Sequence, residues 1–139
     1  MKMTQISVKM PDRPGELSRI SDILGNEGVN IRALAASVHG DDSRIHMLVD
    51  DSAKARDALS ARGFEVEEHT VLAVETPDHP GGLSAILRPL RQASINVTHL
   101  YPLIGGMVDN NAVLILGVDR TDEAIEVLRR DYIRILDRF

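Results

Sequence analysis

An internal repeat limits the folds open to this chain more than any other feature of its sequence. The stretch PDRPGELSRISDILGNEGVNI (residues 11–31) returns 66 residues later as PDHPGGLSAILRPLRQASINV (residues 77–97), with nine of 21 positions identical and no gap. Such a repeat indicates two copies of one structural unit. In a chain of 139 residues each copy has about 65 to 70 residues, so we expect two small domains, 1–68 and 69–139.

Apolar periodicity predicts the same order of elements in both copies. Residues 6–10 alternate apolar and polar, which predicts a strand, and residues 17–24 carry apolar side chains at helical spacing. The remaining strands are expected at 31–35, 45–49, 64–66, 71–76, 95–103, 111–118 and 132–136, and the remaining helices at 52–62, 82–93 and 121–130. Each copy is therefore an α+β unit of order βαββαβ, with an antiparallel sheet and both helices on one sheet face.

Three details depart from a simple repeat. The offset between the copies grows from 66 to 69, which places three extra residues in the turn around GGMVDN (residues 105–110). Pro89 falls inside an expected helix and predicts a kink or a shortened helix. Residues 67–69 alone join the copies, so we expect an interface between the repeats.

Composition excludes several classes of function. A net charge of −5 disfavours nucleic-acid backbones as partners, and the two Tyr and two Phe residues provide few stacking platforms. The absence of cysteine excludes disulfides and thiolate metal sites. No signal peptide and no apolar run of about 20 residues is present, so we expect a soluble cytoplasmic protein that binds neither membranes nor nucleic acid and needs no cofactor.

The repeated stretch supplies groups that suit an α-amino acid. Gly81 and Gly82 stand at a helix start, where about four backbone N–H groups lack helical partners and can hold a carboxylate. Asp78 offers a negative charge for an ammonium group, and the amide of Asn96 can donate and accept. The alternative is structural: Asp12 and Asp78 cap helices, and Asn30 and Asn96 satisfy local backbone groups.

These residues resemble the signature of ACT domains, an Asp-x-Pro-Gly-x-Leu turn and helix followed by an Asn-Ile or Asn-Val strand entry. The resemblance covers nearly the whole chain as two tandem copies without an attached enzyme domain. It implies a ferredoxin-like fold with strand order 4-1-3-2, sheets that pair side by side, and small ligands, commonly amino acids, bound at the seam between domains. The implied ligand-binding residues are Asp12, Gly15, Glu16, Leu17, Asn30, Ile31, Asp78, His79, Gly81, Gly82, Leu83, Asn96 and Val97.

The two copies differ at the helix start. Glu16 occupies the position of Gly82 and brings a negative charge to the place where a ligand carboxylate would bind. We therefore expect the second turn to bind an amino acid more tightly than the first, because Gly82 leaves the backbone N–H groups open.

Other kinds of site have weaker support. The five histidines never occur as an i, i+4 pair, so a metal site would need the fold to gather residues such as His79 and His99, which otherwise are exposed turn and strand residues. No nucleophile, base and orienting group occur together, which predicts no catalytic residues. The sequence thus predicts a non-catalytic, amino-acid-sensing homodimer. The rival hypothesis is a regulatory subunit that docks on a biosynthetic or acyl-activating enzyme and needs no ligand.

Overall fold

The protein consists of two compact units. The computed structural model describes residues 1–138, and for 106–108 it describes the backbone alone. One unit is Thr4–His69, called the N-terminal unit below. The other, the C-terminal unit, comprises the chain from Thr70 onward together with Met1–Met3.

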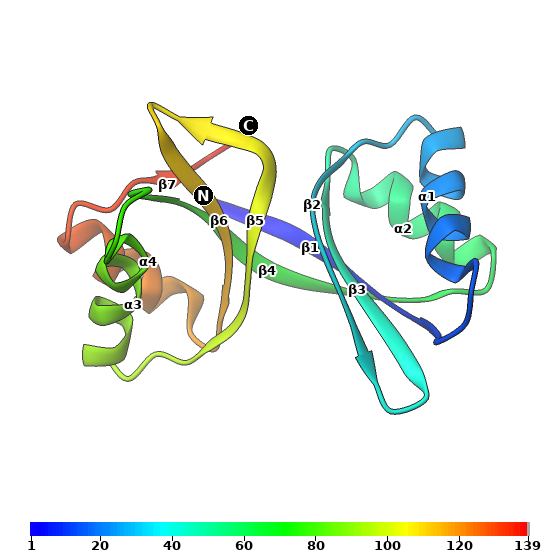
Figure 1. The fold of residues 1–139 in the computed structure, drawn as a ribbon, viewed down its shortest axis with the longest axis horizontal. Coiled ribbons are helices and arrows are strands. Elements are labelled where there is room, and N and C mark those ends of the chain that lie inside the picture. Colours follow the sequence, from blue (N-terminus) through cyan, green and yellow to red (C-terminus); the bar gives the residue numbers. More distant parts are fainter. Residues whose placement is uncertain (139) are drawn as a thin grey trace. The chain divides into compact units, whose positions relative to one another are not determined.

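In the N-terminal unit two helices cover one face of a sheet (Figure 1). Strand β1 pairs antiparallel with β3, β3 pairs antiparallel with β2, and β1 also pairs with β4. The strand order is therefore β4-β1-β3-β2. The elements are β1 (Lys2–Pro11), α1 (Glu16–Asn26), β2 (Ile31–His39), β3 (Asp42–Val49), α2 (Ser52–Ala61) and the first part of β4 (Glu65–Thr76).

The C-terminal unit repeats this arrangement. Strand β4 pairs antiparallel with β6 and β7, and β6 pairs antiparallel with β5, which gives the order β7-β4-β6-β5. The elements after β4 are α3 (Gly82–Gln92), β5 (Val97–Val108), β6 (Asn111–Val118), α4 (Thr121–Arg130) and β7 (Ile135–Leu136). Numbered within each unit, both sheets have the order 4-1-3-2, so the predicted fold of two βαββαβ units is confirmed.

Equivalent apolar positions build the two cores. Each helix turns one apolar stripe towards its sheet, and the residues of that stripe are fully buried. Burying a Leu or Ile side chain contributes about 1.5–3 kcal/mol, so these positions fix how the helices lie. The equivalent buried pairs from the helices are Ile20 and Ile86, Leu24 and Leu90, Ala55 and Ala124, and Leu59 and Leu128.

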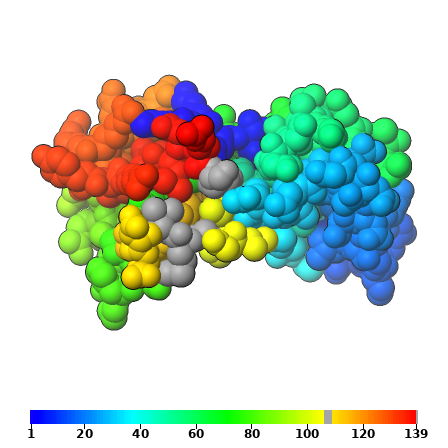
Figure 2. Space-filling view, turned by 90° about the horizontal axis from the view of Figure 1, so that it is seen from above, coloured from blue at the N-terminus to red at the C-terminus, as the bar shows by residue number. Residues whose placement is uncertain are grey.

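The first three residues of the chain belong to the C-terminal unit. The Met1 ammonium group lies 2.9 Å from Asp137 Oδ1, and Lys2 Nζ lies 2.7 Å from Asp122 Oδ1. The nearby ammonium group lowers the pKa of the Asp137 carboxyl below its ordinary value. Figure 2 shows the N-terminal residues (dark blue) beside the C-terminal segment (red).

The three extra residues of the second copy lie in a bulge, which corrects the prediction of a longer turn. Both hairpin turns have two residues, Gly40–Asp41 and Asp109–Asn110. In the β5–β6 ladder, however, Pro102 pairs with Leu114 and Met107 with Ala112, so the extra residues fall between Pro102 and Met107. A bulge keeps the ladder on both sides of the insertion, and Gly105 at φ 65° allows the backbone to bend there.

Two further elements differ from the sequence-based expectation. The expected strands 64–66 and 71–76 are parts of one strand, β4, so residues 67–69 are strand and not a separate linker. Helix α3 is not shortened at Pro89, because it has 11 residues, as many as α1. Packing of its buried face offsets the cost of an internal proline, about 3 kcal/mol in a regular helix. Among the described residues no helix is long and apolar enough to cross a membrane.

Candidate functional site

The repeated Pro-Gly turn has the same backbone conformation before α1 and α3. Gly15 and Gly81 precede the two helices with φ of 92° and 85°, in the left-handed region. An added Cβ at either residue would meet no atom within 4 Å, so space does not require glycine there. The backbone angle does, because L-residues with a side chain avoid this conformation. The repeated glycine is thus a requirement of the turn.

The residue after that glycine has different surroundings in the two units. Glu16 is 7% exposed, and its Oε1 accepts a hydrogen bond from Arg13 Nε at 2.7 Å. At Gly82 an added Cβ would lie 1.9 Å from the Pro77 carbonyl oxygen. The Gly82 N–H donates to the His79 carbonyl at 2.9 Å. The expectation of an open amide at Gly82 is therefore wrong, and the charge of Glu16 is neutralised by an ion pair.

The aspartates of the two turns also differ. Asp12 Oδ1 accepts a hydrogen bond from Ser43 Oγ at 3.1 Å, which ties the first turn to β3. The position equivalent to Ser43 is Ala112, which has no hydroxyl. Within the described residues Asp78 has no hydrogen bond or ion pair, so its carboxylate is available to a ligand. The neighbouring His79 donates from Nδ1 to the Pro80 carbonyl at 2.9 Å.

The leucine of each turn belongs to an apolar surface that both units carry. Leu17 and Leu83 are both 44% exposed, although they are the second residues of α1 and α3. Two further exposed apolar side chains lie on β2, Leu34 and Val38, and two on β5, Leu100 and Ile104. Leu17 and Leu83, and Leu34 and Leu100, are at equivalent positions, whereas Ile104 lies in the bulge between Pro102 and Met107.

Each asparagine is held by an aspartate that sequence analysis did not single out. The Asn30 N–H donates to Asp50 Oδ1 at 2.9 Å, and the Asp50 N–H donates to the Asn30 carbonyl at 3.1 Å. Asn96 and Asp119 make the same reciprocal pair at 3.0 and 3.1 Å. These bonds use only the backbone of the asparagines, so the side-chain amides remain exposed. The signal was available, since Asp50 and Asp119 occupy equivalent positions of the repeat.

Within one unit the turn and the asparagine lie at opposite ends of a helix. The turn precedes α3 and Asn96 follows it, and an 11-residue helix is about 16 Å long. The same holds for α1 in the N-terminal unit. One unit therefore does not bring Asp78 and Asn96 together around a single amino acid. Ile31 and Val97, the next residues after the asparagines, are half-buried against the two cores.

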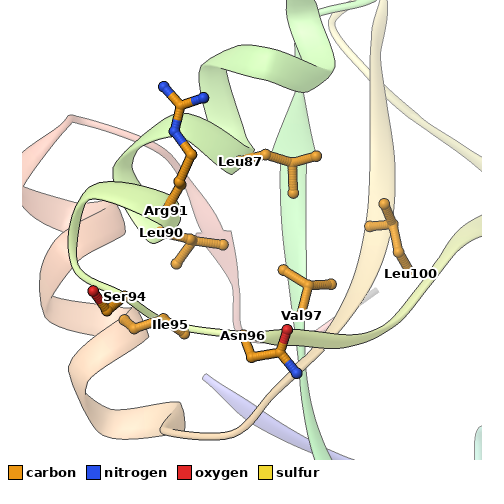
Figure 3. A pocket seen from close by; sticks show the side chains of 8 residues that line it. All are labelled: Leu87, Leu90, Arg91, Ser94, Ile95, Asn96, Val97 and Leu100. Carbon is orange, nitrogen blue, oxygen red and sulfur yellow. The ribbon is translucent and has the colours of Figure 1, made fainter.

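A surface pocket lies beside Asn96 in the C-terminal unit (Figure 3). Its volume is about 430 Å³, and the side chains of Leu87, Val97 and Leu100 point towards one another within it. Sequence analysis missed Leu87 and Arg91, whose counterparts in the first copy are Ser21 and Gly25. The lining residues are Leu87, Leu90, Arg91, Ser94, Ile95, Asn96, Val97 and Leu100.

A serine and a histidine also meet on the N-terminal sheet. Ser7 and His46 pair across β1 and β3, and Ser7 Oγ lies 2.8 Å from His46 Nδ1. The buried amide of Gln5 donates to the same hydroxyl at 3.0 Å. Sequence analysis did not bring these residues together, because only strand register joins them. Since Ser7 is buried and its hydroxyl already accepts a hydrogen bond, we interpret the cluster as structural.

The described residues contain no group of three or more metal-ligating side chains that could hold a metal ion. His79 and His99 therefore do not belong to such a group. His99 Nδ1 instead lies 3.3 Å from Thr98 Oγ1.

Comparisons with known proteins agree with this fold. Residues 4–63 match the ACT domain family. A protein from Bacteroides thetaiotaomicron superposes with a TM-score of 0.89 at 26% identity, over 98% of this chain and 92% of that one. The ligand-free regulatory subunit of aspartate kinase from Thermus thermophilus gives 0.67 at 15% identity, over 93% and 91% of the two chains. Its counterpart from Thermus flavus gives 0.64 at 14%, over 93% and 92%. No curated protein sequence matches the chain.

Proposed function

We propose, from the premise that this chain is a tandem ACT-domain protein, that it is a non-catalytic regulatory protein and that its effector is an amino acid. The premise rests on the family match of residues 4–63 and on the second copy of the same fold and signature. The similar Thermus proteins are regulatory subunits by name, which supports a regulatory role here. An effector of this kind acts by binding one conformation of the protein better than another.

The observation that carries the proposal is the pocket beside Asn96. Leu87, Val97 and Leu100 offer an apolar surface, and about 430 Å³ is enough for a branched aliphatic or aromatic side chain. Arg91 has no ion pair among the described residues, so its guanidinium group is available to the effector's carboxylate. The Asn96 amide can bind either charged end, because it donates and accepts.

We propose the turn before α3 as a second point of contact for the effector. Asp78 is the one turn aspartate that has no partner in the described part of the chain, and an ammonium group would pair with it. Because the turn and Asn96 lie at opposite ends of α3, variants of the two residues report on different contacts. Asp78→Ala should weaken binding only if an effector reaches the turn.

A thermal-shift screen of the twenty amino acids at millimolar concentration tests the proposal. An effector at one hundred times its Kd adds about 2.7 kcal/mol to the folded state, which gives a clear rise in Tm. Calorimetry would then show Asn96→Ala, Arg91→Ala and Leu87→Ser each weakening binding about tenfold, a loss of about 1.4 kcal/mol. Asn30→Ala is the matched control and should leave this site unchanged. If no amino acid shifts the transition, the amino-acid proposal fails.

A second candidate function is supported by the repeated apolar surface. Each unit exposes three aliphatic side chains, among them Leu17 and Leu83. Exposed apolar side chains of this kind suit a docking surface for an enzyme or for a second copy of the chain. We propose a homodimer, which light scattering tests against the 15.3 kDa monomer. If the chain docks on an enzyme without an effector, Leu83→Ser and Leu17→Ser should abolish co-purification equally with and without amino acids.

A further inference from the structure

The N-terminal unit has a pocket of about 350 Å³ that is rich in arginine. It lies between the end of β1, the start of α1 and the connection from α2 to β4. Four cationic side chains line it, Lys9, Arg13, Arg19 and Arg62, together with the ring of Phe64. This pocket is distinct from the pocket beside Asn96, which belongs to the other unit.

Two of the four cations are not paired with a carboxylate. Lys9 Nζ lies 3.3 Å from Asp42 Oδ2, and Arg13 Nη2 lies 2.7 Å from Glu16 Oε1. Among residues 1–138, Arg19 and Arg62 have no carboxylate at ion-pair distance. Glu65 is the third acidic residue of the lining, so the pocket carries four positive and three negative charges.

The guanidinium group of Arg19 is held in place by neutral partners. Its central carbon lies 4.9 Å from the centroid of the Phe64 ring, within the range of a cation–π contact. Arg19 Nη2 also donates a hydrogen bond to the Arg62 carbonyl oxygen at 3.4 Å. These contacts orient the planar group without neutralising it, and an oriented guanidinium group is suited to bidentate binding of an oxyanion.

The second copy of the fold serves as an internal control. The equivalent pocket of the C-terminal unit has a volume of about 340 Å³. Its two acidic residues outnumber the single cation, Arg134. The fold alone therefore produces a cavity at this place, but it does not produce the arginines. The equivalent pairs are Lys9 and Glu75, Arg19 and Ala85, Arg62 and Asp131, and Phe64 and Ile133.

We propose that the pocket at Arg19 and Arg62 binds a small metabolite through a phosphate or carboxylate group, as a second effector site in the N-terminal unit only. Both oxyanions present the planar pair of oxygen acceptors that a guanidinium group binds. The cavity volume suits a small molecule. The site is independent of the amino-acid pocket beside Asn96, so the two proposals succeed or fail separately.

Amide chemical-shift mapping of the isotopically labelled full chain tests this site. Inorganic phosphate and succinate are titrated separately at constant ionic strength, with sodium chloride as the blank. We expect shift changes to gather around Arg19 and residues 62–64 of the N-terminal unit. A stronger response to phosphate identifies a phosphorylated metabolite, and a stronger response to succinate identifies a carboxylate.

Arginine variants decide the result. Arg19→Gln and Arg62→Gln should each weaken phosphate or succinate binding at least tenfold. Arg88→Gln, which removes an exposed charge from α3 in the other unit, should leave it unchanged. The proposal is overturned if chloride causes the same shifts, if the shifts appear at residues 131–134 of the C-terminal unit, or if all three variants bind alike.

Discussion

The N-terminal and C-terminal units share one backbone design but surround their cavities with different charges. The turn glycines at Gly15 and Gly81 differ in φ by only a few degrees, and the asparagine–aspartate pairs have nearly the same hydrogen-bond lengths. The pockets at the starts of α1 and α3 also have nearly equal volumes, yet one has an excess of positive charge and the other of negative charge. Residues that set the backbone are thus the same in both copies, and the charged residues that line the two pockets are not.

The difference extends to how each turn is held. In the first unit Arg13 and Glu16 form an ion pair beside the helix start, and Ser43 holds Asp12. In the second unit the chain is tighter, because the Pro77 carbonyl occupies the space that a side chain at residue 82 would need. The same sequence motif therefore produces two local environments, and the following substitutions test each part of this comparison.

The largest effect is expected from Gly82→Ala. Its Cβ would lie 1.9 Å from the Pro77 carbonyl oxygen, a backbone atom, so the turn has to move. We expect a loss of about 3 kcal/mol in the free energy of unfolding, measured by urea denaturation. Gly25→Ala is the matched control, because an added Cβ meets no atom there and alanine favours a helix by about 0.5–1 kcal/mol. Equal effects of the two variants would show that the close approach at Pro77 is unimportant.

The next largest effects are expected from Gly15→Ala and Gly81→Ala, which should lower the free energy of unfolding by equal amounts. Both residues have φ near 90° and open space around the missing Cβ, so the cost is that of the left-handed backbone, about 1–2 kcal/mol. Denaturant titration of the two variants checks this equality. A difference larger than about 1 kcal/mol would mean that the turns are not equivalent in stability.

Asp50→Ala and Asp119→Ala should each cost about 1 kcal/mol, because each removes one side-chain hydrogen bond to an asparagine N–H. Hydrogen exchange of the Asn30 and Asn96 amides reports the loss directly. Asp57→Ala serves as a control, since among the described residues this exposed carboxylate has a hydrogen bond and ion pair with the neighbouring Arg56 and with no other residue. Unchanged exchange at both asparagines would contradict the structural role of the two aspartates.

The smallest effect is a pH dependence that belongs to the C-terminal unit. Burial raises the pKa of the Tyr101 hydroxyl well above its ordinary value of 10.0, and the equivalent residue of the first copy is Ala35. Above pH 10 the unfolded chain releases this proton and the folded chain keeps it, so stability falls as the pH rises. At pH 10.5 this effect lowers the free energy of unfolding by about 0.8 kcal/mol relative to neutral pH. Tyr101→Phe should remove it, and an identical pH slope in the variant would contradict the assignment.

Much of the fold could be predicted from the sequence, because periodicity and glycine act locally. The apolar stripe that includes Ile20 and Leu24 defines α1, and its repetition at residues 86 and 90 defines α3. Strand limits were less predictable. Residues 67–69 are polar and resemble a linker, but in the structure they are part of β4. The bulge between Pro102 and Met107 depends on the register with β6, which no local pattern reveals.

The candidate site could be predicted only in part. The turn glycines and the two asparagines were found as a motif, because they recur at a fixed offset. Sequence analysis missed Arg19, Arg62 and Leu87, because nothing in the sequence repeats at these positions. Their place at a pocket depends on tertiary packing. The ion pair with Arg13, which neutralises the charge of Glu16 at the start of α1, likewise depends on how the side chains pack.

The placement of Met1–Met3 has a mechanical consequence. These residues and the segment from Thr70 onward form one unit, so Thr4–His69 is in effect inserted within it along the chain. When a pulling force is applied at residues near the two ends, both points of attachment lie in this same unit. That unit, with its Met1–Asp137 contact, has to be pulled apart before force reaches Thr4–His69. Single-molecule stretching should therefore show two rupture events in a fixed order, the C-terminal unit first and the N-terminal unit second.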